Sequence, residues 1–206
     1  MIAIVDYKMG NLRSVQKGFE AAGVPDVVVT DDPGIVAAAD AIVVPGVGAF
    51  RDAAANLRES GMWDVLIERA GQGTPLLGIC LGMQLLVTTG LEDGEWPGLG
   101  LVPGVCDRLP GGVKIPHIGW NTVSFPKESR LFEGVEEGAA FYFVHSYRVV
   151  PDCPFAAACI TEYGVPFVSA VQAGNVFGVQ LHTEKSSTIG LRVLANFGRI
   201  GAGAAS

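Results

Sequence analysis

Short apolar runs alternate with amphipathic stretches through the first eighty residues. The apolar runs are 2–6, 27–30, 41–45 and 75–79, and the amphipathic stretches are 11–23 and 48–60. This alternation predicts parallel strands joined by crossover helices. Runs such as AIVV are apolar at every position, so we expect a sheet that is buried on both faces. The pattern predicts an open, mostly parallel α/β sheet with flanking helices, of the flavodoxin-like kind.

From about residue 95, strand-like segments follow one another with short turns and few helices. They are GLGLVPG, AAFYFVHSYRV, FAAACI, PFVSAVQ and NVFGVQLH, and they predict antiparallel β-structure in the C-terminal half. An amphipathic stretch at 186–200 starts with serines suited to N-capping. It is expected to bury Ile189, Leu191, Leu194, Phe197 and Ile200. Without an internal repeat or a long linker, residues 1–206 are expected to form a single domain.

Composition narrows the possible classes of protein. Hydrophobic residues make up 49% of the chain and charged residues 17%, which excludes a disordered protein. The net charge of −7, with no basic run, argues against a nucleic-acid partner. The apolar N-terminal stretch meets Asp6 at once, which fits a strand better than a signal peptide. The longest apolar stretch, 75–87, is too short to span a membrane. We therefore expect a cytoplasmic location without membrane attachment.

The four cysteines, at 80, 106, 153 and 159, are expected to be free thiols in that setting. No CxxC pair exists and the three histidines are far apart in sequence, so no metal site is predicted.

The segment GICLG, 78–82, has the form of a nucleophile elbow with cysteine at its apex. Glycines at 78 and 82 leave room for a strained turn between a strand and a helix. Amides at the start of that helix would point at the sulfur and stabilise a thiolate. On this motif alone, Cys80 is equally a buried cysteine at a tight turn.

A cysteine nucleophile needs a base, and the base needs a group that orients it. His117 and His145 have no carboxylate within three residues, whereas His182 is followed by Glu184. In an extended segment, residues i and i+2 face the same side, so this carboxylate would reach the imidazole. The alternative is a histidine that ends a strand beside a solvated glutamate.

The loop in VVPGVGAF, 43–50, follows a strand and carries two glycines. It suits an oxyanion hole built from the backbone amides of Val47 and Gly48, with the amide of Leu81 as the second donor. The alternatives are an ordinary strand–helix turn and a phosphate loop. The segment lacks the spacing of GxGxxG and the GK[ST] ending, which argues against a nucleotide site.

With these parts together, the sequence resembles the class I (triad) glutamine amidotransferases, and among them the glutaminase subunits of imidazole glycerol phosphate synthase. The resemblance runs along nearly the whole chain through IVDYKMGNLRSV, PGVGAF, GICLGMQLL, GLGLVPG, KIPHIGWN, YFVHSY and EKSS. It implies a cofactor-free glutaminase in histidine biosynthesis, with Cys80 as nucleophile, His182 as acid and base, and Glu184 orienting His182. It also implies that substrate glutamine is held by Gln84, Glu92, His145, Ser146 and Tyr147.

The resemblance further implies a heterodimer with a (β/α)₈ cyclase subunit that receives the ammonia. Asn11, Arg13, Trp120 and Lys185, which lie in family-specific stretches, are the expected interface residues. One departure concerns position 183, where the family usually has proline and this chain has threonine. Losing proline should loosen the pair His182–Glu184, although a β-branched residue keeps part of the restriction.

Two other functions stay open at this point. One is the subunit of another triad amidotransferase, serving anthranilate, aminobenzoate or pyridoxal phosphate synthesis. The other is a catalytically silent binding or regulatory module that keeps the fold with Cys80 buried. The acceptor of the ammonia distinguishes the first alternative from the proposed subunit. The reactivity of Cys80 toward a glutamine-like electrophile distinguishes the second.

Overall fold

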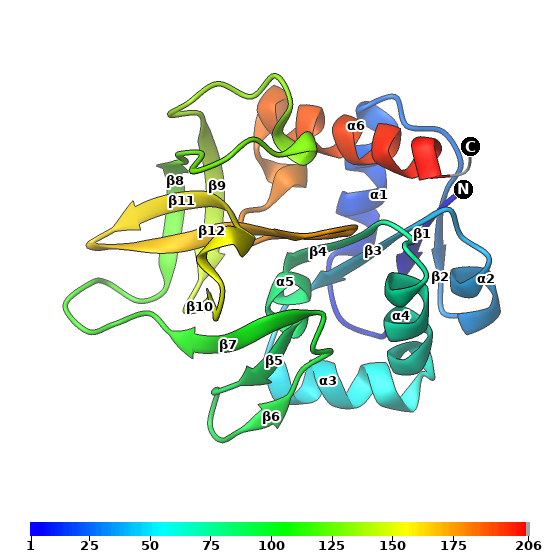
Figure 1. Ribbon diagram of the computed structural model, residues 1–206, viewed down its shortest axis with the longest axis horizontal. Helices are drawn as coiled ribbons and strands as arrows, with labels where there is room; N and C mark the ends of the chain where they lie inside the picture. The colour runs from blue at the N-terminus through cyan, green and yellow to red at the C-terminus, as the bar shows by residue number, and fades with distance from the viewer. Residues whose placement is uncertain (205–206) are drawn as a thin grey trace.

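A central parallel sheet organises the protein, whose computed structural model describes residues 1–204 (Figure 1). Its first four strands are β1 (Ile2–Val5), β2 (Val27–Thr30), β3 (Ala41–Gly46) and β4 (Leu76–Cys80). They lie in the order β2–β1–β3–β4, and all their pairings are parallel. Strand β13 (Val176–Val179) extends this sheet beside β4, also in parallel. The predicted α/β sheet is confirmed, and its fifth parallel strand comes from the far end of the chain.

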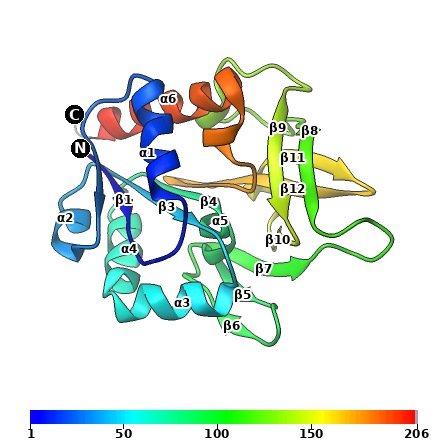
Figure 2. The ribbon, with the colours of Figure 1, turned by 180° about the vertical axis from the view of Figure 1, so that it is seen from behind.

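Helices cover both faces of this sheet (Figures 1 and 2). They are α1 (Leu12–Ala21), α2 (Pro33–Ala37), α3 (Phe50–Glu59), α4 (Met62–Gly71), α5 (Leu81–Leu85) and α6 (Ser187–Ala204). Alternate residues of a strand enter separate cores. Ala3 and Val5 pack with α2 to α5, whereas Ile2 and Ile4 pack with α1 and α6. This two-sided burial is why the parallel strands are apolar at consecutive positions.

The predicted helices at 11–23, 48–60 and 186–200 are α1, α3 and α6, but the sequence analysis did not identify α2 or α4. Helix α2 has only five residues. Helix α4 follows α3 directly across Gly61, whose φ of +73° makes a single tight turn between them.

The second half of the chain continues the sheet, mostly with antiparallel pairings, as predicted. Beyond β13 the order is β12–β10–β7–β5–β6, and β11 pairs with β12. These strands are β5 (Val87–Gly90), β6 (Trp96–Pro97), β7 (Val102–Arg108), β10 (Tyr147–Pro151), β11 (Ala157–Tyr163) and β12 (Val165–Ala173). Strand β13 joins the two halves because it is parallel to β4 and antiparallel to β12. The pair β5–β7 is parallel.

Strands β8 (His117–Thr122) and β9 (Ala140–His145) form a second, two-stranded antiparallel sheet. The reading of AAFYFVHSYRV as one strand is wrong, because the chain bends at Ser146. The two parts pair differently: β9 with β8, and β10 with β7 and β12. Three short 3₁₀ turns complete the structure, namely η1 (Arg130–Phe132), η2 (Pro154–Ala156) and η3 (Thr183–Lys185).

Helix α6 buries the predicted face, with Leu194 and Phe197 fully enclosed and the other three predicted residues partly so. Ser186 does not cap α6 as expected. Its hydroxyl accepts the N–H of Tyr142 and donates to the carbonyl of His182. Ser186 therefore ties η3 to β9. No helix within residues 1–204 combines the length and apolarity needed to cross a membrane.

Candidate active site

Cys80 stands at a sharp corner between β4 and α5. Its backbone has φ +56° and ψ −111°, a region that residues with side chains rarely adopt. The flanking glycines make this corner possible. A Cβ on Gly82 would lie 1.7 Å from the carbonyl oxygen of Val44, and one on Gly78 would lie 2.6 Å from the backbone of Gly82. The strand–turn–helix geometry expected of GICLG is present.

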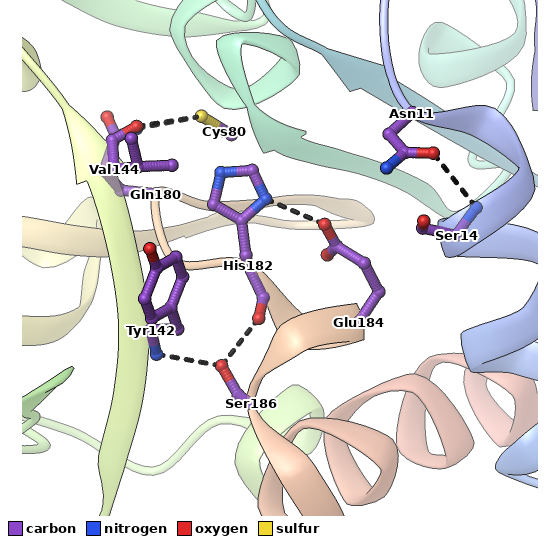
Figure 3. A network of polar contacts seen from close by, with 9 residues as sticks. All are labelled: Asn11, Ser14, Cys80, Tyr142, Val144, Gln180, His182, Glu184 and Ser186. Atoms are coloured by element: carbon purple, nitrogen blue, oxygen red, sulfur yellow. Dashed lines mark hydrogen bonds and ion pairs between the residues drawn. The ribbon is translucent and has the colours of Figure 1, made fainter. Parts of the chain in front are cut away.

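The sulfur of Cys80 lies among polar groups, although the residue is only 6% exposed. Its Sγ is 3.9 Å from the carbonyl oxygen of Val144, to which the thiol form donates (Figure 3). The side-chain amide of Gln180 donates to Sγ over 3.6 Å. The side chain of His182 points toward Cys80 in the same view. The structure thus brings the predicted nucleophile and base together.

His182 is held by Glu184 on one side and is free on the other (Figure 3). Its Nδ1 lies 2.8 Å from Glu184 Oε1, and both side chains are almost completely buried. Its Nε2 has no hydrogen-bond partner among the described residues. Burial alone would lower the pKa of His182, but the nearby Cys80 and the hydrogen bond and charge of Glu184 outweigh burial and raise that pKa to about 9. Such an imidazole holds its proton in the folded protein.

The backbone around this pair differs from the expected extended segment. His182 itself is extended, with φ −92° and ψ 95°, but the following residues form the 3₁₀ turn η3. The carboxylate of Glu184 reaches the imidazole across this turn rather than along a strand. Thr183, which lies between them, is 0% exposed, and its Oγ1 has no hydrogen-bond partner among residues 1–204.

A cavity of about 310 Å³ opens beside Cys80 and contains every predicted oxyanion-hole and substrate residue. It is lined by Val47, Gly48, Cys80, Leu81, Gln84, Glu92, Pro116, Val144, His145, Ser146, Tyr147 and His182. Two larger hollows, around η1 and beside the end of β1, contain none of the predicted site residues.

The predicted oxyanion-hole loop follows β3 directly and borders this cavity. Val47 is 47% exposed, and Gly48 has a φ of +106°, which favours glycine. The amides of Val47 and Gly48 donate to no acceptor within residues 1–204. Leu81, the first residue of α5, carries its amide on the other side of Cys80, where Cys80 pairs with Gly46 of β3. Backbone donors on two sides of a cysteine are what a developing oxyanion requires.

Most of the predicted substrate side chains are already bonded to the protein. The amide of Gln84 donates to Gln180 Oε1 and to the carbonyl of Tyr147, at 3.0 and 3.2 Å. His145 Nδ1 lies 2.8 Å from the same carbonyl. Glu92 Oε2 accepts the N–H of Phe50, the first residue of α3, at 2.6 Å. These side chains build the wall of the cavity, and Glu92 Oε1 accepts no hydrogen bond from residues 1–204.

The predicted interface residues lie on the side of η3. Lys185 Nζ is 6.0 Å from the ring centre of Tyr142, and Trp120, which is 57% exposed, meets the same ring at 6.1 Å. Asn11 begins α1, where its side chain accepts the N–H of Ser14, and Arg13 in the first turn of α1 is exposed. Helix α1 packs against η3 through Gly18, where a Cβ would be 3.3 Å from Glu184 Cβ.

Sequence analysis missed four residues of the site: Val144, Gln180, Pro116 and His117. The first two contact Cys80, Pro116 lines the cavity, and His117 lies behind it. A signal existed for Gln180, because it is a polar residue that directly follows an apolar strand and lies two residues before His182. Within residues 1–204, no three His, Cys, Asp or Glu side chains cluster as metal ligands do.

Comparisons with known proteins agree with this geometry. The sequence profile of the family described as "Glutamine amidotransferase class-I" matches residues 3–199. The imidazole glycerol phosphate synthase subunit HisH of Moorella thermoacetica is 54% identical over 199 residues, which are 97% of this chain and 94% of that protein. The subunit of that name from Aquifex aeolicus is 51% identical over 196 residues, 95% of each chain.

Two solved structures share the fold. One titled "Crystal structure of glutamine amidotransferase" has a TM-score of 0.76 at 19% identity, covering 98% of this chain and 100% of that chain. PurLQS from Thermotoga maritima has a TM-score of 0.72 at 21% identity, covering 95% and 96%.

Proposed function

The chain belongs to the class-I glutamine amidotransferases, and on this premise we propose that it is the glutaminase subunit of an imidazole glycerol phosphate synthase. It hydrolyses L-glutamine to glutamate and ammonia. The ammonia passes to a cyclase subunit, which makes imidazole glycerol phosphate and aminoimidazole carboxamide ribonucleotide in histidine biosynthesis. Relatives that carry this subunit name share 54% and 47% of their residues with nearly the whole chain. We propose that the chain acts as one amidotransferase domain in the cytoplasm.

The first half of the reaction forms a thioester. The thiolate of Cys80 attacks the side-chain carbonyl carbon of glutamine, and the carbonyl oxygen becomes an oxyanion. Amides of the loop at Val47 and Gly48, with the amide of Leu81, donate to that oxygen. His182 gives the proton on Nε2 to the leaving nitrogen, the carbon–nitrogen bond breaks, and ammonia departs. Glu184 keeps the imidazole oriented through Nδ1.

The second half regenerates the enzyme. His182, now neutral, takes a proton from water through Nε2 while the water oxygen attacks the thioester carbon. The same backbone amides hold the second oxyanion. The carbon–sulfur bond then breaks, glutamate leaves, and the sulfur returns to the thiolate beside a protonated His182. The position of Nε2, buried and without a protein partner, serves both proton transfers.

Recognition of glutamine is proposed to combine backbone amides with one carboxylate. The N–H of Ser146 donates to no acceptor within residues 1–204 and borders the cavity, so it suits the α-carboxylate. Glu92 Oε1 suits the α-ammonium group. Gln84, His145 and Tyr147 hold the wall through their bonds to one another. The neutral side-chain amide of glutamine then reaches Cys80 at the other end of the cavity.

The cyclase is proposed to bind the surface formed by Asn11, Arg13, Trp120 and Lys185. An exposed tryptophan beside cationic side chains is typical of a protein interface. The surface lies next to η3, which carries Glu184, so a partner bound there would contact the element that orients His182.

One observation carries the proposal: His182 is bonded to Glu184 through Nδ1 and presents a free Nε2 to the cavity of Cys80. Ammonia release from glutamine by the complex with the cyclase tests it. Cys80→Ala should abolish release, whereas the exposed Cys153→Ala should leave it unchanged. Full activity of Cys80→Ala would contradict the assignment.

The alternatives left open by the sequence predict other results. A subunit for anthranilate, aminobenzoate or pyridoxal phosphate synthesis would release ammonia with a different acceptor subunit and not with the cyclase. A silent module would leave Cys80 inert to a chloroketone analogue of glutamine. The cavity at Cys80, together with the free amides at Val47 and Gly48, favours the enzyme.

A further inference from the structure

A chain of hydrogen bonds runs behind the glutamine cavity from β10 to the outer end of β8. His145 Nδ1 lies 2.8 Å from the carbonyl oxygen of Tyr147, and His145 Nε2 lies 3.0 Å from His117 Nδ1. His117 Nε2 lies 3.3 Å from Asn121 Nδ2, which also donates to the carbonyl of Glu162 at 2.9 Å. Neither His117 nor Asn121 belongs to the reaction proposed above.

The hydrogen-bond partners of Asn121, His117 and His145 fix the position of each shared proton. Asn121 Oδ1 accepts the N–H of Thr122, so Nδ2 faces His117 and donates to its Nε2. His117 must then carry its proton on Nδ1, which donates to His145 Nε2. His145 must carry its proton on Nδ1, which donates to the carbonyl of Tyr147. Both rings are therefore neutral Nδ1–H tautomers, with every ring nitrogen bonded.

The surroundings favour neutral rings held in one orientation. His117 is 2% exposed and stacks between the rings of Phe143 and Tyr163, whose centroids are 4.9 and 4.0 Å away. Phe167 packs against the edge of His117 and, tilted, against His145. Burial lowers the pKa of His145 to about 4 and also lowers the pKa of His117.

At its inner end, this series of hydrogen bonds reaches the bend at Ser146, which borders the glutamine cavity. The carbonyl of Tyr147 accepts from both His145 and Gln84, and the carbonyl of Ser146 accepts the N–H of Leu109 at 2.9 Å. These bonds fix the peptide planes that follow Ser146 and Tyr147. The N–H of Ser146 lies in the preceding plane, between His145 and Ser146, and the bond from the side chain of His145 to the carbonyl of Tyr147 closes a ring that contains this plane.

We propose that His117 is a positioning residue for the glutamine site, acting through His145 to hold the bend at Ser146 in the geometry that receives the substrate α-carboxylate. The proposal rests on the proposed glutaminase function, and it adds the residue that orients the binding bend. Because His117 contacts neither Cys80 nor Glu184, its loss weakens glutamine binding and leaves the bond-breaking steps largely intact.

The test measures glutamate formation by the complex with the cyclase at varied glutamine concentration. His117→Phe fills the aromatic slot and cannot donate, so KM rises about tenfold, the factor for about 1.4 kcal/mol, while kcat stays within about twofold. His117→Asn places an amide N–H where Nδ1 was and returns KM to within about threefold of wild type. Tyr163→Phe keeps the stacked ring and loses only a bond to the carbonyl of Lys114, so it is the control with wild-type KM.

A folded His117→Phe complex with wild-type KM overturns the proposal, and so does His117→Asn with no better KM than His117→Phe. Histidine ¹⁵N spectra of the wild-type protein give a second test that needs no folded variant. They must show neutral rings protonated at Nδ1 for both His117 and His145, and an Nε2–H tautomer at either ring overturns the chain. If the wild-type complex forms no glutamate, the proposed function fails, while the tautomer result stands on its own.

Discussion

The buried hydroxyl of Thr183 predicts that this chain becomes more stable when threonine is replaced. Thr183 is 0% exposed, and its Oγ1 bonds to nothing among residues 1–204. A buried hydroxyl without a partner costs about 1–3 kcal/mol. Thr183→Val keeps the β-branched shape and removes only this oxygen. We expect it to raise the free energy of unfolding by about 1 kcal/mol, the lower end of that range.

Thr183→Pro should add a second gain from the backbone. His182 already has the extended geometry that a residue before proline prefers, and Thr183 begins a 3₁₀ turn, where φ is near that of proline. Thr183 is the first residue of η3, a position whose N–H has no partner inside the turn and where proline is well tolerated. Restricting the unfolded chain contributes about 0.4–1 kcal/mol more.

Thermal unfolding of the isolated chain measures both gains. For a protein of this size, each kcal/mol corresponds to about 2–4 °C in Tm. We expect Tm to rise by about 3 °C in Thr183→Val and by about 5 °C in Thr183→Pro. The exposed Thr188, in the first turn of α6, provides the matched control, and Thr188→Val should change Tm little. Ammonia release by the complex should be retained in both variants at position 183.

The two variants separate the two parts of the reasoning. A lower Tm in Thr183→Val would show that the hydroxyl has a partner, such as a bound water, and would refute the first part. A higher Tm in Thr183→Val with a lower Tm in Thr183→Pro would refute the second part. The turn has little room to adjust, because the carbonyl of Thr183 lies 1.9 Å from where a Cβ on Gly190 would be.

Three further predictions follow from other parts of the molecule. The pKa of His182, raised from 6.5 to about 9, means that the folded state keeps a proton that the unfolded state loses, so stability should fall as pH rises through this interval. The pKa of His145, lowered to about 4, has the opposite effect, so stability should fall as pH drops from 6.5 toward 4. Urea unfolding across both pH intervals measures how the free energy of unfolding changes with pH in each. Gly82→Ala should lower the free energy of unfolding, measured in urea, by more than about 3 kcal/mol, because the added Cβ meets a carbonyl oxygen of β3. Gly71→Ala, which has open space around its Cβ, should be neutral or slightly stabilising. Trp120→Ala should weaken cyclase binding about tenfold in a titration, and an unchanged Kd would remove that residue from the proposed interface.

The corner at Cys80 and the pair His182–Glu184 of the candidate site could be predicted from the sequence, because both depend on near neighbours in the chain. Gly78 and Gly82 flank Cys80 within five residues, and Glu184 is two residues from His182. The parallel strands could be predicted for a similar reason, since burial on both faces makes each of them apolar throughout. Even here the local reasoning was incomplete, because η3 replaces the extended segment after His182.

The rest of the site depends on which strands become neighbours, and strand order is not written in local patterns. Gln180 reaches Cys80 only because β13 pairs with β4, across about a hundred residues of sequence. Val144 reaches the same sulfur because the chain bends at Ser146 and sends β9 into a different sheet from β10. The alternation of apolar residues continues through that bend, so the pattern gave no sign of it.

Strand order also explains why the proposed recognition of the substrate depends largely on backbone amides. Polar side chains that line the cavity come from elements that meet only in the folded chain, and they are already bonded to the protein: Gln84 of α5 to Gln180, and His145 of β9 to a carbonyl of β10. Donors without an acceptor among residues 1–204 include amides at sharp turns, such as those of Gly48 and Ser146, whose directions are set by the fold. Fixed donors require no reorganisation when charge develops on the substrate, which is the condition for electrostatic stabilisation of an oxyanion. The bonds that occupy the side chains are therefore what keep the free amides in place.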